Sequence, residues 1–226
     1  MSGAEITVRW AHLDVSRAQG VESVLAPDEL GRAAAFSFDR DRRRFVVARA
    51  LLRTLLGERL GLDARQVEIA YGPRGKPRLA REGTLRFSLS HSNGVAAIAL
   101  CEGREVGIDI EALRDDLPAE RLAQRFLPAP VASKVQSGAA PSRLREFFRG
   151  WVRQEAYAKG RGAGLELIGQ TPDPGDWTVL DLKLLDGFAA AVAVQGPPPP
   201  RLDTRHLDAD QVLRSSGATA PGTVAG

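Results

Sequence analysis

The sequence predicts an α+β protein, with a pseudo-twofold arrangement of two similar α+β halves that each pack an antiparallel sheet on a long helix. One observation is a short internal repeat, in which residues 93–100 (NGVAAIAL) match residues 186–193 (DGFAAAVA) in pattern. Each copy follows a strand pattern and, further upstream, a helical one. The other observation is a pair of long helical patterns, at residues 39–60 and 142–161. Together they indicate that the same arrangement of a long helix and antiparallel strands occurs twice in the chain.

The boundary between the two halves is predicted near residues 104–110. This gives an N-terminal half at residues 1–106 and a C-terminal half at residues 107–196, and ligand clefts tend to lie at such boundaries. Residues 197–226 begin with a run of prolines and end in Ser, Gly, Ala and Thr, which predicts a disordered tail.

The composition is that of an ordinary soluble globular protein. Of its 226 residues, 43% are hydrophobic and 26% are charged, so a real hydrophobic core can form. The net charge of +3 suits an anionic partner without requiring nucleic acid. The single cysteine, Cys101, excludes an internal disulfide and fits a reducing, cytoplasmic location. The longest apolar runs, at residues 95–101 and 188–194, are too short to span a bilayer.

The N-terminal elements follow from simple patterns. Residues 5–15 alternate well enough to form a strand. Pro27, with two acids directly after it, begins a helix. A longer helix is expected from Asp39 to Leu60, with Gly61 as its end.

Two groups of cations point to a phosphate ligand. Along one edge of the apolar face of the second helix lie Arg42, Arg49 and Arg53. A solvated basic face is the plain alternative, but guanidinium groups in line suit a phosphate. The loop at residues 71–77 (YGPRGKP) holds Arg74 and Lys76 in a defined turn, which alone is equally consistent with a surface loop.

Two strands are expected at residues 85–100, around a polar turn. Ser90, His91 and Ser92 come just before this turn. No G-x-S-x-G elbow surrounds them, which argues against a serine hydrolase.

The next strand pattern carries two acids on one face. Residues 105–111 (EVGIDIE) alternate strictly, so Asp109 and Glu111 share the face away from the core, ~6.6–7 Å apart at the backbone. Two carboxylates at this spacing can converge on one hard cation, although a polar strand face would look the same. Gly107 on that face lets another group approach closely.

The C-terminal half is expected to contain a helix with a carboxylate on its apolar side. Residues 118–135 are predicted to be helical in part, residues 138–141 to form a linker, and Ser142 to cap the long helix that follows. On a helical wheel, Glu155 falls in the middle of that helix's apolar arc and Lys159 lies at its edge. A carboxylate there is costly unless a positive partner meets it.

These groups together describe a metal and phosphate site. Three carboxylates without histidine or cysteine suit a hard, oxygen-loving ion: Asp109, Glu111 and Glu155. Because cations remain beyond the metal, the substrate is expected to carry several phosphates. The chemistry indicated is displacement at a diphosphate.

Four motifs in order resemble those of a known family. Residues 106–111 (VGIDIE) and 151–159 (WVRQEAYAK) resemble the paired signature of the 4′-phosphopantetheinyl transferases, (V/I)-G-(I/V)-D and W-x-x-K-E-(A/S)-x-x-K. Residues 75–77 (GKP) and 87–92 (FSLSHS) are similar to the family's G-K-P and F-N-x-S-H-S. The length and two-half layout resemble the surfactin-synthetase-activating (Sfp-like) subgroup, and the resemblance covers residues 30–195.

The resemblance implies a reaction and a set of roles. The enzyme would use Mg²⁺, or Mn²⁺, to transfer the 4′-phosphopantetheine arm of coenzyme A to a serine of an acidic acyl or peptidyl carrier protein, releasing adenosine 3′,5′-bisphosphate. It would act as a monomer, without nucleic acid or membrane. The metal ligands would be Asp109, Glu111 and Glu155. Glu155 would also accept the serine proton, directly or through a metal-bound water, and Lys159 would steady the leaving phosphate. The residues implied to bind coenzyme A are Arg49, Arg74, Lys76, Ser90, His91, Gln154 and Lys159.

One departure from the family pattern leaves alternatives open. Gln154 stands where the family usually has lysine, so it can hydrogen-bond a phosphate oxygen but brings no charge. The first alternative is a catalytically impaired coenzyme A or phosphate-binding module. The second is a nucleic-acid-binding protein that uses the arginine run at residues 40–44, although Asp41 interrupts it and no aromatic residues are interleaved.

Overall fold

The computed structural model describes residues 5–14, 20–167, 169–170 and 175–215, and it has the α+β fold class that the sequence predicts. The chain divides into two compact units that are interleaved in the sequence. Unit 1 comprises residues 1–9, 69–93 and 97–205, and unit 2 comprises residues 10–68, 94–96 and 206–226. The predicted halves are instead consecutive, and they stay a prediction.

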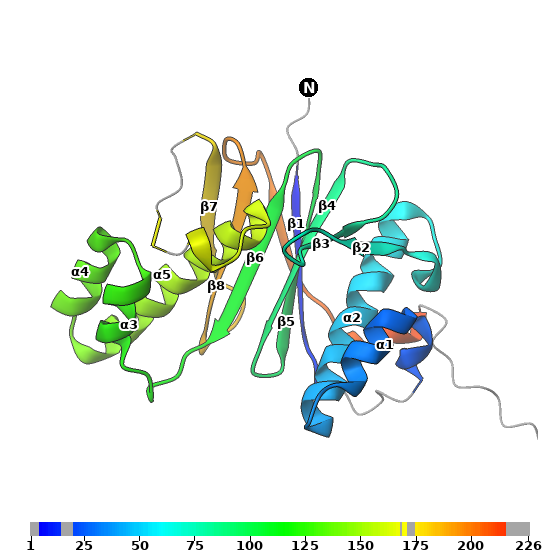
Figure 1. Cartoon of the computed structure of the whole chain (residues 1–226), viewed down its shortest axis with the longest axis horizontal. Helices are drawn as coiled ribbons and strands as arrows, with labels where there is room; N and C mark the ends of the chain where they lie inside the picture. The colour runs from blue at the N-terminus through cyan, green and yellow to red at the C-terminus, as the bar shows by residue number, and fades with distance from the viewer. Residues whose placement is uncertain (1–4, 15–19, 168, 171–174, 216–226) are drawn as a thin grey trace, which may run out of the picture. The chain divides into compact units, whose positions relative to one another are not determined.

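An antiparallel sheet and one long helix form the part of unit 1 that matters most for function. The strands are β6 (Val106–Ala112), β8 (Phe188–Gln195) and β7 (Trp177–Leu182), in the order β6-β8-β7. Helix α5 (Ala140–Arg161) packs across β6 and β8 (Figure 1). Val152 and Ala156 of the helix form a buried cluster with Ala191 and Ala193 of β8. Small side chains on both surfaces therefore let helix and sheet approach closely.

The remaining strands form a second sheet and a short hairpin. The sheet has the order β4-β5-β1-β9. Its strands are β1 (Ile6–His12), β4 (Leu85–Ser92), β5 (Val95–Glu102) and β9 (Leu202–His206). The hairpin pairs β2 (Ile69–Tyr71) with β3 (Pro77–Leu79), so Arg74 and Lys76 lie in its turn.

Most of the described residues beyond 196 form a strand and a helix, so the prediction of a disordered tail is wrong for them. Strand β9 lies beside β1, and α6 (Ala209–Ser215) follows it. The backbone N–H of Ile6 donates to the carbonyl of Arg201 at 3.1 Å, and Arg9 forms an ion pair with Asp203 at 2.8 Å. Because the prolines end at residue 200, β9 begins only after them and can pair normally. Residues 216–226 lie outside the described part.

The helices of the C-terminal region also differ from expectation at one point. Helices α3 (Ala119–Phe126) and α4 (Ala129–Ser137) confirm that residues 118–135 are helical in part. The predicted linker and cap are wrong, because α5 already begins at Ala140 and its N-cap residue, Ala139, makes no side-chain cap. Pro141 lies in the first turn, where its missing N–H costs nothing.

Unit 2 is built around α2 (Asp39–Leu60), which ends as predicted with Gly61 in the left-handed region at φ 66°. Around it pack α1 (Pro27–Ala34), α6 and the short 3-10 helices η1 (Val21–Val24) and η2 (Ala64–Gln66). Within the part of the chain that is described, no helix is both long and apolar enough to cross a membrane.

Candidate active site

Two glycines bring β6 and α5 into backbone contact. A Cβ atom at Gly107 would come within 2.1 Å of the Ala156 carbonyl oxygen and 2.3 Å of the Gly160 nitrogen, so no side chain fits there. A Cβ at Gly160 would meet the ring of Trp177 at 2.5 Å. The sequence predicted a close approach at Gly107, and the approaching group is the backbone of α5. This contact sets the distance between the acids of β6 and the polar residues of α5.

Lys159 reaches from α5 to the central acid of β6. Its Nζ lies 2.6 Å from Oδ1 of Asp109 and donates to Oγ of Ser90 at 2.9 Å. Ser90 Oγ in turn donates to the same Asp109 oxygen at 2.7 Å. Asp109 is only 2% exposed, and among the described residues its Oδ2 is the one buried side-chain polar atom without a hydrogen-bond partner. An unsatisfied carboxylate oxygen in such a place is a candidate cation ligand.

Alternate serines of β4 hold the acid-bearing strand in place. Ser92 Oγ donates to Oε2 of Glu111 at 2.8 Å and accepts from the N–H of Ala112 at 3.1 Å. Further back along the same face of β4, Ser88 Oγ accepts from the N–H of Ile108 at 3.1 Å. Ser88 and Ser92 were not among the site residues expected from the sequence, although their spacing of two around Ser90 is the signal that could have found them.

The electrostatics show three carboxylates that share one ammonium group. Burial raises the pKa of Glu111 above its usual range, and the nearby charge of Asp109 raises it further. Burial likewise raises the pKa of Glu155, with Asp109 and Glu111 adding repulsion, while Lys159 acts in the opposite direction on both. Asp109, Glu111 and Glu155, the carboxylate trio, are therefore close enough to interact, and their negative charge is only partly balanced.

The donor set fits a hard divalent cation, although the ligands are not gathered around one point. Carboxylate oxygens are the ligands that Mg²⁺ prefers, and Asp109 Oδ2 is an unused one. Across the described residues, no three His, Cys, Asp or Glu side chains are arranged to hold a metal ion as they stand. Lys159 is instead the cation at Asp109, so side chains would have to rotate for a metal to enter.

The two cations of the β2–β3 turn are engaged in ion pairs. Lys76 Nζ lies 2.6 Å from Oε2 of Glu105 and 2.5 Å from the carbonyl oxygen of Gly160. Arg86 binds the other oxygen of Glu105 at 2.8 Å. Arg74, at the tip of the turn, pairs with Glu166 at 2.8 Å. The turn is thus tied to the C-terminal end of α5, one residue beyond Lys159.

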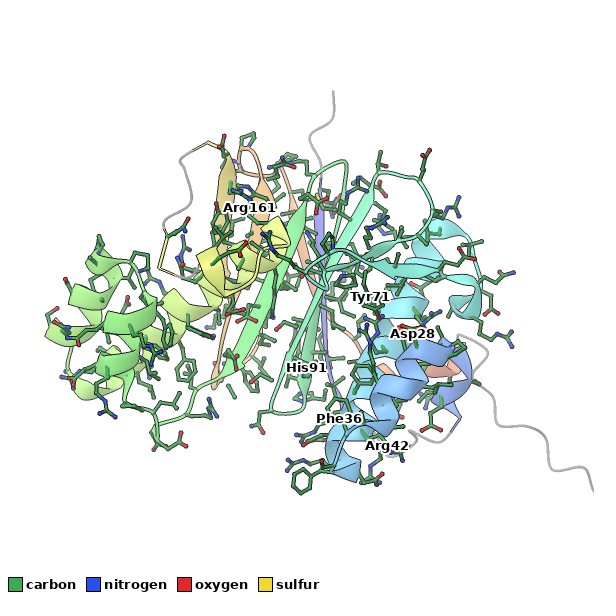
Figure 2. All side chains as sticks on the ribbon, viewed as in Figure 1. Asp28, Phe36, Arg42, Tyr71, His91 and Arg161 are labelled. Atoms are coloured by element: carbon green, nitrogen blue, oxygen red, sulfur yellow. The ribbon has the colours of Figure 1, made fainter. Side chains whose placement is uncertain are left out.

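A cavity of about 950 Å³ lies beside this turn. Its walls include Lys76, Arg86, Arg161 and Trp177. Figure 2 labels Arg161 at the end of α5, and it also labels His91, whose exposed side chain stands near the end of β4. The carboxylate trio is not part of the cavity wall.

Two predicted ligand-binding residues are buried and point elsewhere. Arg49 of unit 2 donates from Nε to Glu29 at 2.7 Å and is 5% exposed, so it is not presented to a ligand in this structure. Arg53 pairs with the other oxygen of Glu29 at 2.5 Å. Gln154 is 6% exposed, and its amide bonds the backbone of Gly169 and Gln170 rather than facing the trio.

Comparison with known proteins gives one consistent result. The profile described as "4′-phosphopantetheinyl transferase, N-terminal" matches residues 10–102, and that of the 4′-phosphopantetheinyl transferase superfamily matches residues 105–201. The chain is 38% identical to 4′-phosphopantetheinyl transferase HetI of Nostoc sp. over 80% of its own length and 83% of HetI. It is 31% identical to a phosphopantetheinyl transferase of Thraustochytrium sp., over 69% and 58% of the two chains. With 4′-phosphopantetheinyl transferase AcpT of Escherichia coli it shares 36% identity over 54% and 58%.

Proposed function

We propose, from the premise that the chain belongs to the 4′-phosphopantetheinyl transferase superfamily, that Asp109, Glu111 and Glu155 form its catalytic centre. The protein is an enzyme that transfers the 4′-phosphopantetheine arm of coenzyme A to a serine of a carrier protein and releases adenosine 3′,5′-bisphosphate. The observation that best supports this assignment is the buried, unpartnered oxygen of Asp109 within a group of carboxylates that repel one another. Such a group suits a cation and the phosphates that accompany it.

Magnesium is the metal that this donor set favours, with manganese as an alternative. When bound, it would neutralise charge on the diphosphate of coenzyme A. Asp109 would supply its Oδ2, and Glu111 and Glu155 would supply one or more oxygens. Ser90 and Ser92, which bond Asp109 and Glu111, would keep these side chains oriented.

Glu155 is proposed to accept the proton of the carrier serine. Its raised pKa makes the ionised carboxylate a better base than that of an ordinary glutamate. The serine oxygen forms a bond to the β-phosphorus of coenzyme A, while the bond from that phosphorus to the bridging oxygen breaks. The electron pair leaves with adenosine 3′,5′-bisphosphate. Lys159, which is already beside Asp109, would stabilise the charge that develops on the leaving phosphate.

Coenzyme A is proposed to contact Ser90, His91, Arg74 and Lys76. Lys76 would have to exchange Glu105 for a phosphate oxygen, whereas the exposed guanidinium of Arg74 has further N–H donors and can contact phosphate while it stays paired with Glu166. Arg49 is not part of the proposed set, since its guanidinium is buried against Glu29. A phosphate there would have to compete with a carboxylate already in place.

The competing functions are less well supported. The inactive binding module is disfavoured because the relatives are named as transferases over much of the chain. The arginine run is neutralised by neighbouring acids, which argues against a nucleic-acid surface. These ion pairs join Arg40 to Asp41, Arg42 to Asp39 and Glu22, Arg43 to Asp39, and Arg44 to Asp14.

Several finer assignments are part of the same proposal. The chain is assigned to the Sfp-like subgroup, with a pseudo-twofold relation between its halves, and acts as a monomer. Its carrier is acidic, in keeping with the net charge of +3 on the enzyme. A cytoplasmic location rests on the single cysteine.

Intact mass spectrometry tests the proposal. An apo carrier protein is incubated with coenzyme A and the enzyme, with Mg²⁺ or with EDTA. We expect the carrier to gain the mass of one phosphopantetheine arm only when the metal is present. Transfer that continues unchanged in excess EDTA would exclude a metal-dependent centre at the carboxylate trio.

A further inference from the structure

Gln154 uses both ends of its side-chain amide to hold the chain that follows α5. Its Nε2 donates to the carbonyl of Gln170 at 2.9 Å, and its Oε1 accepts from the N–H of Gly169 at 3.1 Å. The side chain is 6% exposed. The amide therefore serves a peptide segment in the same way that a neighbouring strand would.

The segment held in this way is connected to the β2–β3 turn by noncovalent contacts. Within it, Gln170 Nε2 donates to the carbonyl of Glu166 at 2.9 Å. The carboxylate of Glu166 then pairs with Arg74 at 2.8 Å. The turn returns to the helix through Lys76, which bonds the carbonyl of Gly160 at 2.5 Å. A closed set of contacts thus runs from α5 through Gly169, Gln170 and Glu166 to the turn and back to α5.

We propose that Gln154 is a positioning residue that fixes Gly169 and Gln170 on α5 and, through Glu166, holds the Arg74–Lys76 turn ready for coenzyme A. The inference rests on the proposed function, because it assumes that this turn contacts the substrate. It assigns to the glutamine a task that the family's usual lysine cannot perform. Gln154 is therefore a specialised replacement and not a lost phosphate contact.

Hydrogen-bonding capacity explains why glutamine is required here. A lysine ammonium has donors only, so it could serve the carbonyl of Gln170 but would leave the N–H of Gly169 without its acceptor. A glutamate would accept from Gly169 but repel the carbonyl of Gln170. Only an amide of this length satisfies both groups.

The two explanations of Gln154 predict opposite results for Gln154→Lys. If the chain merely lacks a charge at the phosphates, restoring lysine should raise kcat. If Gln154 positions the turn, lysine should loosen Gly169 and Gln170 and raise KM for coenzyme A. In that case kcat at saturating coenzyme A and KM for the carrier should change little, because Glu155 and Lys159 are untouched.

The experiment combines amide hydrogen exchange with steady-state kinetics on the full chain. For Gln154→Lys, we expect exchange at Gly169 to accelerate about fivefold to tenfold, the effect of losing one hydrogen bond, whereas Gln154→Glu keeps an acceptor for this N–H and should leave its exchange nearly unchanged. KM for coenzyme A should rise by a similar factor in Gln154→Lys. The matched control is Gln124→Lys, an exposed glutamine of helix α3, which should alter neither quantity.

A second variant tests the connection to the turn and guards against general destabilisation. Glu166→Gln leaves Gln154 intact but removes the charge opposite Arg74. It should raise KM for coenzyme A as well, and its effect should not add to that of Gln154→Lys, because both act through the same contacts. Fully additive effects would overturn the connection.

The proposal is also overturned if Gln154→Lys raises kcat while exchange at Gly169 stays as in the wild type. Exchange is measured without substrate, so it tests the positioning role even if the enzyme proves inactive. Inactive wild-type protein with the expected exchange changes would instead refute the proposed function.

Discussion

Two clusters of charge in this protein, one buried and one partly buried, are satisfied to very different degrees. In unit 2, the single carboxylate of Glu29 faces two guanidinium groups, those of Arg49 and Arg53. In unit 1, the carboxylates of Asp109, Glu111 and Glu155 share one ammonium, that of Lys159.

The pKa values of the two clusters are shifted in opposite directions. Burial raises the pKa of Glu29, but the two arginines and a backbone N–H outweigh it and hold the pKa below its usual range. Burial raises the pKa of Glu111 and Glu155, and their neighbours do not compensate. A buried charge that its neighbours satisfy supports the fold, whereas one left unsatisfied indicates a site for a ligand.

The largest effect is expected for Glu155→Gln. The variant loses both a proposed metal ligand and the proposed base, so kcat should fall by about 10²–10⁴-fold. Its thermal midpoint without metal at pH 7 should rise, because glutamine removes a carboxylate whose ionisation the fold disfavours. Mass spectrometry of the carrier and thermal melts measure the two quantities. A loss of activity below tenfold would remove Glu155 from the mechanism.

The corresponding change in unit 2, Glu29→Gln, should reduce stability. It leaves two nearly buried guanidinium groups without a counter-charge, and breaking such a pair costs about 3–5 kcal/mol. Urea denaturation measures the free energy of unfolding. Glu22→Gln, at an exposed ion pair with Arg42, is the control and should change it by less than about 1 kcal/mol. Equal effects of the two substitutions would show that burial does not distinguish these pairs.

Gly107→Ala should affect both stability and activity. The added methyl group would collide with the backbone of α5, which cannot move aside as a side chain can, and a loss of about 3 kcal/mol is expected. Activity should fall because Asp109 and Lys159 move apart. Gly31→Ala, in helix α1 with open space around the new methyl group, is the matched control and should be neutral or stabilising. Wild-type stability in Gly107→Ala would contradict the close contact.

Dependence on pH should separate the clusters with opposite signs. The pKa of Glu155 is raised in the folded state, so its contribution to stability is present below its usual value of 4.5 and is lost as the pH rises through the raised pKa. The pKa of Glu29 is lowered, so its contribution is present above the same value and is lost as the pH falls.

Unfolding free energies between pH 3 and pH 8 test these signs. Relative to the wild type, Glu155→Gln should gain stability as the pH rises, and Glu29→Gln should lose it. Added Mg²⁺ should stabilise the wild type more at pH 8 than at pH 5, because the trio must be ionised to bind it. Curves that shift in the same direction for both variants would contradict the assigned pKa directions.

Patterns along the chain were sufficient to predict the main parts of the candidate site. The alternation of residues 105–111 places Asp109 and Glu111 on one face, and Gly107 signalled a close approach before its partner was known. The helical wheel placed Glu155 among apolar residues, where burial raises its pKa. These features are local, so periodicity alone reveals them.

Features that depend on distant partners could not be predicted in the same way. Arg49 was expected to bind a phosphate because its pairing with Glu29 could not be foreseen. Glu29 lies twenty residues earlier and has the pattern of an ordinary acid at the start of a helix. The amide of Gln154 serves a segment fifteen residues later, and β9 forms because β1 offers it an edge. In each case the deciding contact is tertiary, and the sequence carries no periodic sign of it.

Calorimetric titration of Mg²⁺, in the presence of coenzyme A, tests whether the carboxylates around Asp109 hold the metal. It compares the wild type with Asp109→Asn and with Glu29→Gln at a temperature where all three are folded. We expect one Mg²⁺ site in the wild type and in Glu29→Gln, and its loss in Asp109→Asn. Unchanged Mg²⁺ affinity in Asp109→Asn would contradict the assignment of the unsatisfied carboxylates as the metal site.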